Sequence, residues 1–160
     1  MTALLDIASL GGHTMGTAWQ VKLVVPSGRD LHPLHAGIQA RLDAVVAQMS
    51  TWEADSDISR FNRAAPGTAL PLPALFAEVM DGALDIARRS DGAFDPTVGP
   101  LVALWGFGAH ARARRVPDEA LLAATRARCG WQRLQWQHGS LLQPGALELD
   151  LSAIAKGFAV

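Results

Sequence analysis

Hydrophobic and polar positions follow both strand-like and helix-like patterns along this chain. In residues 18–25, AWQVKLVV, the side chains of Val21, Leu23 and Val25 fall on one alternating face. A Pro-Ser-Gly run follows, so we predict a strand that ends there. From residue 34 to 49 apolar residues recur at helical spacing with polar residues between them, which predicts an amphipathic helix. Its apolar positions are Leu34, Ile38, Leu42, Val45, Val46 and Met49.

Two further helices are predicted downstream. One spans residues 73–90, with Arg88 and Arg89 in its last turn and Gly92 placed to end it. The other spans residues 117–129, with acidic residues in its first turn, arginines in its last and a glycine after it. Short strands are then predicted over residues 131–137, 140–143 and 146–151, joined by turns at His138-Gly139 and Pro144-Gly145.

The last residues predict a helix in which Ser152 is the N-cap and residues 153–160 form the first turns. The sequence stops inside this apolar helix, with no capping glycine and no polar tail. We therefore expect these 160 residues to be the N-terminal part of a longer protein.

Composition narrows the class of protein. With 160 residues, 49% hydrophobic and 18% charged, the chain has the size and make-up of one globular domain. A formal net charge of -1 gives no general electrostatic attraction to nucleic acid or to an acidic membrane. Cys129 is the only cysteine, which excludes an internal disulfide and a zinc site built from thiolates. The apolar runs are far shorter than the roughly 20 residues of a membrane span.

The start of the chain does not match a secretory signal peptide. It has no basic leader, contains Asp6 and offers only short apolar patches. Either a cytoplasmic start or a trimmed one is compatible with this pattern.

Four segments combine glycine, proline, aromatic and carboxylate residues in a way that periodicity alone does not require. They are residues 13–17, 49–62, 91–108 and 148–157. In the third, Asp95 precedes Pro96 and is either a helix cap with proline at the first helical position or a carboxylate that meets a ligand. In the second, Trp52 is either a core aromatic or a flat surface on which a planar ring stacks.

Asp150 and Lys156 lie on either side of a predicted helix start. A carboxylate, open backbone groups and an ammonium at such a junction suit an anionic ligand, or a metal with its phosphate. The alternative is that Asp150 only organises the turn and that Lys156 extends along the surface. The chain contains 14 lysines and arginines, of which Lys22 and Lys156 are the only lysines, so we favour a ligand role for Lys156.

Other chemistries are disfavoured. Residues 106–111 match G-x-G-x-x-A, but Pro117 follows too soon for the long helix of a dinucleotide-binding fold. The five histidines form no helical metal pair, and no G-x-S-x-G element is present. Zinc binding and serine hydrolase chemistry are therefore not expected.

Taken together, MGTAWQVKL, MSTWEADSDISRFN, DGAFDPTVGPLVALWGFG and LDLSAIAKGFAV resemble the motifs of the ApbE family, in the family's order and spacing, from Met15 to Val160. Members of this family are FAD:protein FMN transferases, which move FMN from FAD to a threonine or serine hydroxyl of a target flavoprotein. The resemblance implies an α+β fold related to the T-fold, with antiparallel sheet and packed helices.

The resemblance also implies site residues. The positions that match family contacts to FAD are Met15, Trp52, Ala93, Phe94, Asp95, Asp150 and Lys156. Ala153 matches a position whose backbone carbonyl helps to hold Mg²⁺. The family's main magnesium carboxylates lie in a C-terminal half, so we expect residues 1–160 alone to form a half-site that neither holds magnesium well nor turns over.

Partners and location follow from the same resemblance. The implied partners are FAD and a target flavoprotein, with no nucleic acid and with membrane contact only through the target. Relatives are often exported lipoproteins anchored through an N-terminal cysteine, and this chain shows neither a signal peptide nor such a cysteine. A non-catalytic FAD-binding or carrier module is the alternative function.

Overall fold

The computed structural model describes residues 4–109, 116–137 and 139–160. The chain contains both helices and antiparallel sheets, so the α+β prediction is confirmed. In chain order the elements are β1 (Leu5–Thr14), β2 (Thr17–Pro26), α1 (His32–Met49), α2 (Asp57–Arg63), β3 (Ala69–Pro71), α3 (Ala74–Arg89), α4 (Gly99–Leu104), α5 (Glu119–Arg126), the 3-10 turn η1 (Trp131–Arg133), β4 (Gln135–Gln137), β5 (Ser140–Leu142) and α6 (Ala155–Phe158).

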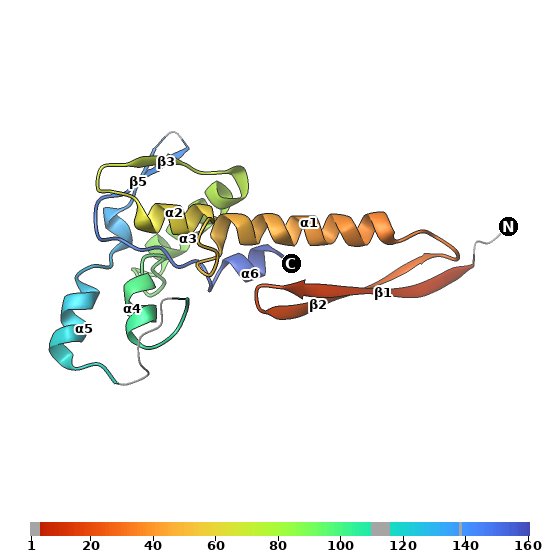
Figure 1. The fold of residues 1–160 in the computed structure, drawn as a ribbon, viewed down its shortest axis with the longest axis horizontal. Coiled ribbons are helices and arrows are strands. Elements are labelled where there is room, and N and C mark those ends of the chain that lie inside the picture. The colour runs from red at the N-terminus through yellow and green to blue at the C-terminus, as the bar shows by residue number, and fades with distance from the viewer. Residues whose placement is uncertain (1–3, 110–115, 138) are drawn as a thin grey trace.

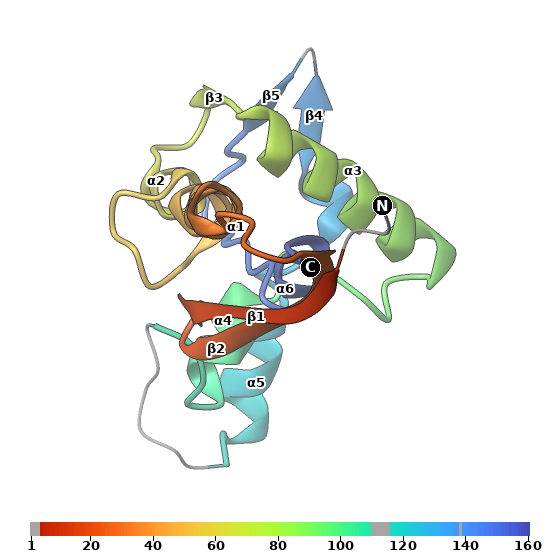
Figure 2. The same cartoon turned by 90° about the vertical axis from the view of Figure 1, so that its right-hand side faces the viewer.

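A long hairpin and the longest helix form an arm at one end of the molecule (Figure 1). β1 and β2 pair antiparallel from Leu5 opposite Pro26 to Thr14 opposite Thr17. The two residues between them, Met15 and Gly16, both have positive φ, at 49° and 71°. This is the conformation that a two-residue turn needs to match the twist of the strands. The turn lies at the end of the hairpin nearest the body, close to α6 (Figure 1), and Figure 2, viewed from the outer end of the arm, shows the hairpin below α1.

The body at the other end is built around one hydrophobic core. α2 and α3 pack there with a three-stranded antiparallel sheet in the order β3-β5-β4. The apolar faces of α1 and α3 supply much of this core, as their periodicity predicts. Its fully buried large side chains include Ile58, Phe61, Phe76, Met80, Leu141, Leu147, Leu149 and Leu151.

α2 is held at its start by a serine cap. Ser56 is 2% exposed, and its Oγ accepts a hydrogen bond from the Ser59 N–H at 3.2 Å, as an N-cap does. The same Oγ donates to the Ser50 carbonyl at 2.6 Å, directly after α1. One hydroxyl thus joins the end of α1 to the start of α2 and shapes the loop between them.

The predicted helices and strands are mostly present with shifted ends. The helices predicted over 34–49, 73–90 and 117–129 correspond to α1, α3 and α5. The strand predicted over 131–137 is split into η1 and β4, and the one over 140–143 is β5. α2, α4, β1 and β3 were not predicted from the pattern. The turn at His138-Gly139 and the G-x-G-x-x-A match lie partly outside the described residues.

Two predictions near the end of the chain are wrong. Residues 146–151 form no regular strand, because among the described residues they pair with a neighbouring backbone only at a parallel bridge between Val98 and Glu148 and through the bond from the Asp150 N–H to the Pro96 carbonyl. Ser152 does not cap a helix, since α6 begins at Ala155 and the three residues before it form a turn. Asp150 takes the organising role, because its Oδ1 accepts the Ser152 N–H at 2.8 Å.

No helix in the described ranges combines the length and the apolar character needed to cross a membrane.

Candidate functional site

A pocket of about 570 Å³ lies where the arm meets the body. Three parts of the chain enclose it: the hairpin turn, the end of α1 with the loop after it, and the start of α6 (Figure 1). Its lining residues are Met15, Gly16, Val45, Val46, Met49, Ser50, Thr51, Trp52, Glu53, Ser152, Ala155 and Lys156.

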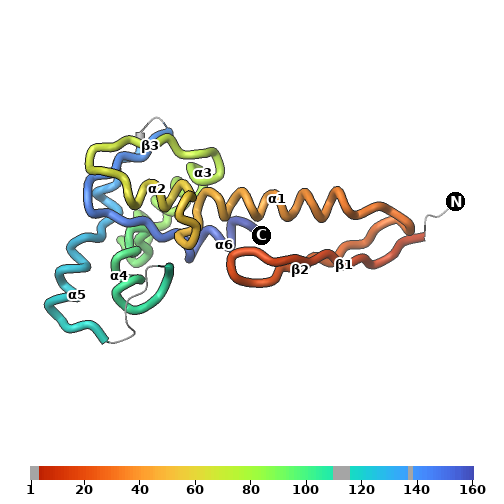
Figure 3. The backbone as a smooth tube through the Cα atoms, viewed as in Figure 1, coloured from red at the N-terminus to blue at the C-terminus, as the bar shows by residue number. Residues whose placement is uncertain are grey.

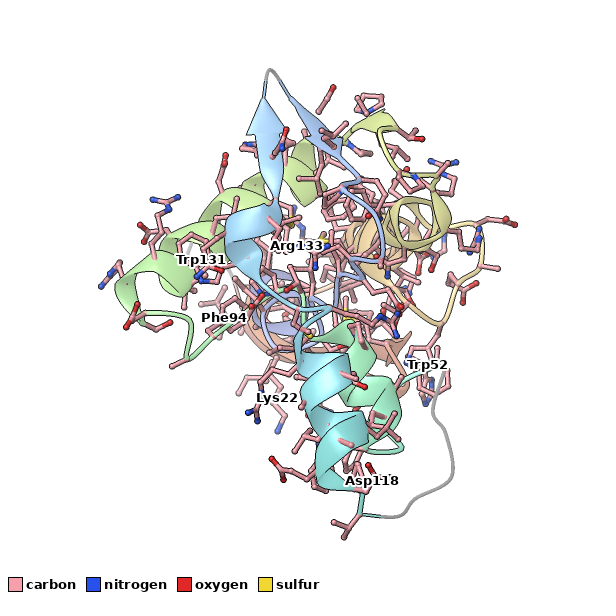
Figure 4. All side chains as sticks on the ribbon, turned by 90° about the vertical axis from the view of Figure 1, so that its left-hand side faces the viewer. Lys22, Trp52, Phe94, Asp118, Trp131 and Arg133 are labelled. Carbon is pink, nitrogen blue, oxygen red and sulfur yellow. The ribbon has the colours of Figure 1, made fainter. Side chains whose placement is uncertain are left out.

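One wall of the pocket is aromatic and apolar. Val45 and Met49 on α1 are each 5% exposed and present apolar surface to it. Trp52 follows in the loop, and its backbone N–H donates to Ser50 Oγ at 3.2 Å. The Trp52 indole is 72% exposed and lies at the outer edge of the molecule (Figure 4). The interpretation of Trp52 as a core aromatic is therefore wrong, and the ring is available for stacking.

The start of α6 supplies a lysine to the pocket lining. Lys156 lies on the first turn of α6 and is exposed. Ser152 and Ala155 line the pocket beside it, whereas Ala153, also exposed, and Asp150 are not part of the lining. The pocket thus combines an exposed tryptophan and apolar side chains, from α1 and the loop after it, with a lysine from α6.

Asp95 is held by hydrogen bonds within its own neighbourhood. Its Oδ1 accepts from the Thr97 N–H at 2.8 Å and from Thr97 Oγ1 at 2.6 Å, and its Oδ2 accepts from the Trp131 N–H at 3.2 Å. α4 begins only at Gly99, with Val98 as its N-cap residue, so Asp95 is not the helix cap considered from the sequence. Its carboxylate instead closes a short turn and ties that turn to η1.

Thr97 completes this cluster. It is 0% exposed, and its Oγ1 also accepts the Gly130 N–H at 2.7 Å. Its hydroxyl therefore donates to Asp95 and accepts from a residue 33 positions later. Without the hydroxyl, both the Gly130 N–H and one oxygen of Asp95 would lose a partner.

The Asp95 loop is bonded to the segment that leads into the pocket. The Asp150 N–H donates to the Pro96 carbonyl at 2.9 Å, next to the Val98–Glu148 bridge. A Cβ on Gly99 would lie 2.9 Å from the Glu148 carbonyl oxygen, so only glycine allows this approach. The loop and the segment therefore form one backbone-bonded unit.

The structure thus places the sequence-predicted site residues in two groups. Met15, Trp52 and Lys156 line one pocket. Ala93, Phe94 and Asp95 are not in that lining, and Figure 4 shows Phe94 beside Trp131, away from Trp52. The predicted contacts of this second group with FAD remain a prediction.

Sequence reasoning missed several lining residues. Val45, Val46 and Met49 were assigned only to the apolar face of their helix, and Ser50 and Thr51 had no role. For Met49, Ser50 and Thr51 the available signal is their position directly before Trp52 in the MSTW motif.

Metal-binding capacity among the described residues is low. No group of three or more His, Cys, Asp or Glu side chains in the described ranges is placed to hold a metal ion. Burial raises the pKa of the Cys129 thiol above its usual value, and the nearby Asp95 charge raises it further. The thiol is therefore protonated near neutral pH and is a poor ligand and nucleophile.

The sequence and the fold match a known family. The ApbE family model matches residues 15–160, which is most of the chain. The chain therefore belongs to the ApbE family, as its motifs indicate.

Curated relatives are named FAD:protein FMN transferase. The protein from Klebsiella pneumoniae (strain 342) is 39% identical over 155 residues, covering 94% of this chain and 44% of the relative. The one from Vibrio cholerae serotype O1 is 39% identical over 153 residues, covering 94% and 46%. The chain thus spans about half the length of the curated relatives it matches.

Solved structures give the same result. The apo form of the Pseudomonas stutzeri flavinyl transferase ApbE aligns with a TM-score of 0.90 at 37% identity, over 100% of this chain and 54% of that one. The flavin transferase ApbE from Vibrio cholerae aligns with a TM-score of 0.92 at 37% identity, over 98% and 52%. The expected ApbE architecture is confirmed.

The Thr97 cluster yields a stability prediction. Replacing Thr97 by valine keeps the shape but removes the hydroxyl, so we expect the free energy of unfolding to fall by about 2–3 kcal/mol. Thr97→Ser keeps the hydroxyl and should cost only about 1 kcal/mol, for the lost methyl group. Urea denaturation of both variants measures the difference. A loss of stability in Thr97→Ser that equals or exceeds the loss in Thr97→Val would contradict the role assigned to the hydroxyl.

Proposed function

We propose that this protein acts in the transfer of FMN from FAD to a threonine or serine hydroxyl of a target flavoprotein, with release of AMP. The observation that carries the proposal is the single pocket that joins Met15, Trp52 and Lys156 from three separate parts of the chain. The names of the curated relatives support the same activity.

The make-up of the pocket suits a flavin dinucleotide. FAD has two planar ring systems joined through a diphosphate, so it needs flat apolar surface and positive charge within one cavity. The exposed Trp52 indole offers a stacking surface, and Met15 borders the same space from the hairpin turn. The Lys156 ammonium, which lines the same pocket, supplies charge for the phosphates.

The remaining predicted residues are assigned to the nucleotide's periphery. Asp150 and Asp95 are proposed to fix polar groups of FAD, with Ala93 and Phe94 contributing the adjoining loop. The bonded unit of the Asp95 loop and the segment before α6 supports this assignment, because it holds the Asp95 loop in register with Asp150.

The reaction is a phosphoryl transfer. The acceptor oxygen forms a bond to the FMN phosphorus, the bond from that phosphorus to the bridging oxygen breaks, AMP leaves, and the hydroxyl proton is released. The protein's own share is to orient the diphosphate and to balance its charge. No side chain described here is assigned as the base.

Magnesium dependence belongs to the proposal, but the described residues do not form a magnesium site. Mg²⁺ requires an octahedral set of oxygen ligands, and no cluster of carboxylates is present in the described ranges. The Ala153 carbonyl is the one group of this chain proposed as a ligand. No step of the proposed transfer is assigned to the metal.

One assay tests the proposed activity. The full-length protein is used, because residues 1–160 span only about half the length of the curated relatives. It is incubated with FAD, Mg²⁺ and a target flavoprotein that carries an acceptor threonine, and flavin fluorescence of the denatured target is measured. Covalent fluorescence, absent from a target with the acceptor threonine replaced by alanine, supports transfer. FAD binding without covalent product supports a non-catalytic FAD-binding or carrier module, and absence of both contradicts the proposal.

Trp52 provides a test of the stacking surface. We expect Trp52→Ala to weaken FAD binding about tenfold or more, because stacking on an aromatic side chain contributes about 1–3 kcal/mol. Trp52→Tyr keeps an aromatic ring and should bind FAD nearly as well as the unaltered protein. The melting temperature without FAD should not change, since the indole is 72% exposed. Unchanged affinity in Trp52→Ala, measured by flavin fluorescence titration, would exclude stacking.

Lys156 provides a test of the phosphate contact. A charged hydrogen bond of about 1.5–3 kcal/mol predicts that Lys156→Ala weakens FAD binding by about 10- to 100-fold and slows transfer, with the fold intact. Lys22→Ala is the matched control, because Lys22 is exposed on β2 and is not in the pocket lining (Figure 4). The proposed role is lost if the Lys156→Ala and Lys22→Ala variants bind FAD equally well in a titration at low salt.

A further inference from the structure

We propose that Asn62 is a positioning residue, which fixes the segment from Leu149 to Lys156 and thereby one wall of the pocket. Its carboxamide makes two hydrogen bonds to one backbone unit 87 residues away. Oδ1 accepts the Leu149 N–H at 2.8 Å, and Nδ2 donates to the Leu149 carbonyl at 2.9 Å. That the wall binds FAD rests on the proposed function.

The segment needs this amide because backbone pairs with it on one side only. On that side the Val98–Glu148 bridge and the bond from the Asp150 N–H to the Pro96 carbonyl hold it. On the other, side-chain amides take the place of a neighbouring strand. Asn62 satisfies both polar groups of Leu149, and Gln143 Nε2 donates to the Leu147 carbonyl at 3.0 Å. Without hydrogen-bond partners, these backbone N–H and carbonyl groups would lower the stability of the fold, because the segment is largely buried.

Asn62 lies on a helix that is anchored in the core. It lies on α2, whose Ile58 and Phe61 are both 0% exposed in the core. The start of α2 is bonded to the Ser50 carbonyl through Ser56 Oγ. The seven-residue helix therefore connects the loop of Trp52 at one end to the segment of Lys156 at the other, and the tube in Figure 3 shows that segment passing beneath α2.

The effect of Asn62 reaches the pocket through consecutive residues. Leu149 directly precedes Asp150, whose Oδ1 holds the turn at Ser152, a lining residue. The Leu151 carbonyl then accepts the Ala155 N–H at 2.8 Å, where α6 begins. A shift at Leu149 would therefore displace Asp150, Ser152 and Lys156 together, relative to Trp52.

The test compares Asn62→Leu with Gln143→Met, two changes that remove a buried amide but keep side-chain bulk. Backbone hydrogen exchange, followed residue by residue, is measured for each variant without FAD, and FAD affinity is measured by fluorescence titration well below the melting temperature. Asn62→Asp is a third variant, because it keeps side-chain size and an acceptor for the Leu149 N–H but replaces the donor to the Leu149 carbonyl by a carboxylate oxygen.

We expect Asn62→Leu to speed exchange about tenfold or more at Leu149, Asp150 and Ser152, and to weaken FAD binding about tenfold. Gln143→Met should speed exchange at Gly145, whose N–H donates to Gln143 Oε1. It should leave FAD affinity close to that of the unaltered chain, because Gln143 bonds the segment only at Leu147, before Leu149 and the turn at Ser152. Asn62→Asp should weaken FAD binding by an intermediate factor.

Several outcomes overturn the inference. One is an Asn62→Leu chain that melts at a lower temperature but binds FAD normally. Another is a loss of affinity in both the Asn62 and Gln143 variants in proportion to their loss of stability, which indicates only a structural role. If Asn62→Leu does not fold, normal FAD binding by Asn62→Asp overturns it equally. Failure of the unaltered chain to bind FAD contradicts the proposed function, whereas unchanged exchange at residues 149–152 contradicts the role of Asn62 itself.

Discussion

The pocket depends on how one short segment, residues 147–152, is held in an extended path without a sheet. Its backbone groups are buried next to the core, where each unpaired N–H or carbonyl would cost about 1–3 kcal/mol. The chain satisfies them with the backbone of residues 96–98 on one edge and with the amides of Asn62 and Gln143 on the other. This arrangement holds the segment as far as Leu151, whose side chain is 0% exposed in the core, and the chain turns directly after it.

The turn after Leu151 places functional groups at the surface. A regular strand would continue to pair its backbone, but here the chain turns at Ser152 and starts α6, so that Lys156 reaches the pocket. The Asp95 loop is joined to the same segment through Pro96. Asp95 and Asp150, which lie 55 positions apart in the sequence, are thus in one structural unit.

The hairpin arm contributes to the pocket in a different way. The antiparallel register of β1 and β2 leaves only Met15 and Gly16 for the turn, and both take the left-handed conformation. The hairpin lies along α1, where the Trp19 Nε1–H donates to Gln39 Oε1 at 3.0 Å. The turn is therefore brought beside the end of α1, and Met15 meets Trp52 and Lys156 around one space.

The amino-acid sequence by itself determined the elements whose signals are local, together with the family. Helical periodicity located α1 and α3, and four motifs in order identified the chain as an ApbE relative, which the comparisons confirm. β1 escaped prediction because Ser9, Gly11 and Gly12 weaken its strand pattern. Met15 was selected as a site residue only through the resemblance, whereas Trp52 and Lys156 were also considered as ligand contacts from their own sequence context.

Only the tertiary structure decided the exposure of Trp52, the partners of Asp95 and the path of residues 146–151. Each depends on contacts between distant parts of the chain: Asp95 with Trp131, and Leu149 with Asn62. The apolar alternation of residues 146–151 correctly indicates burial. Whether a buried extended segment becomes a strand depends on what lies beside it, and here one neighbour is a pair of side-chain amides, which no local pattern encodes.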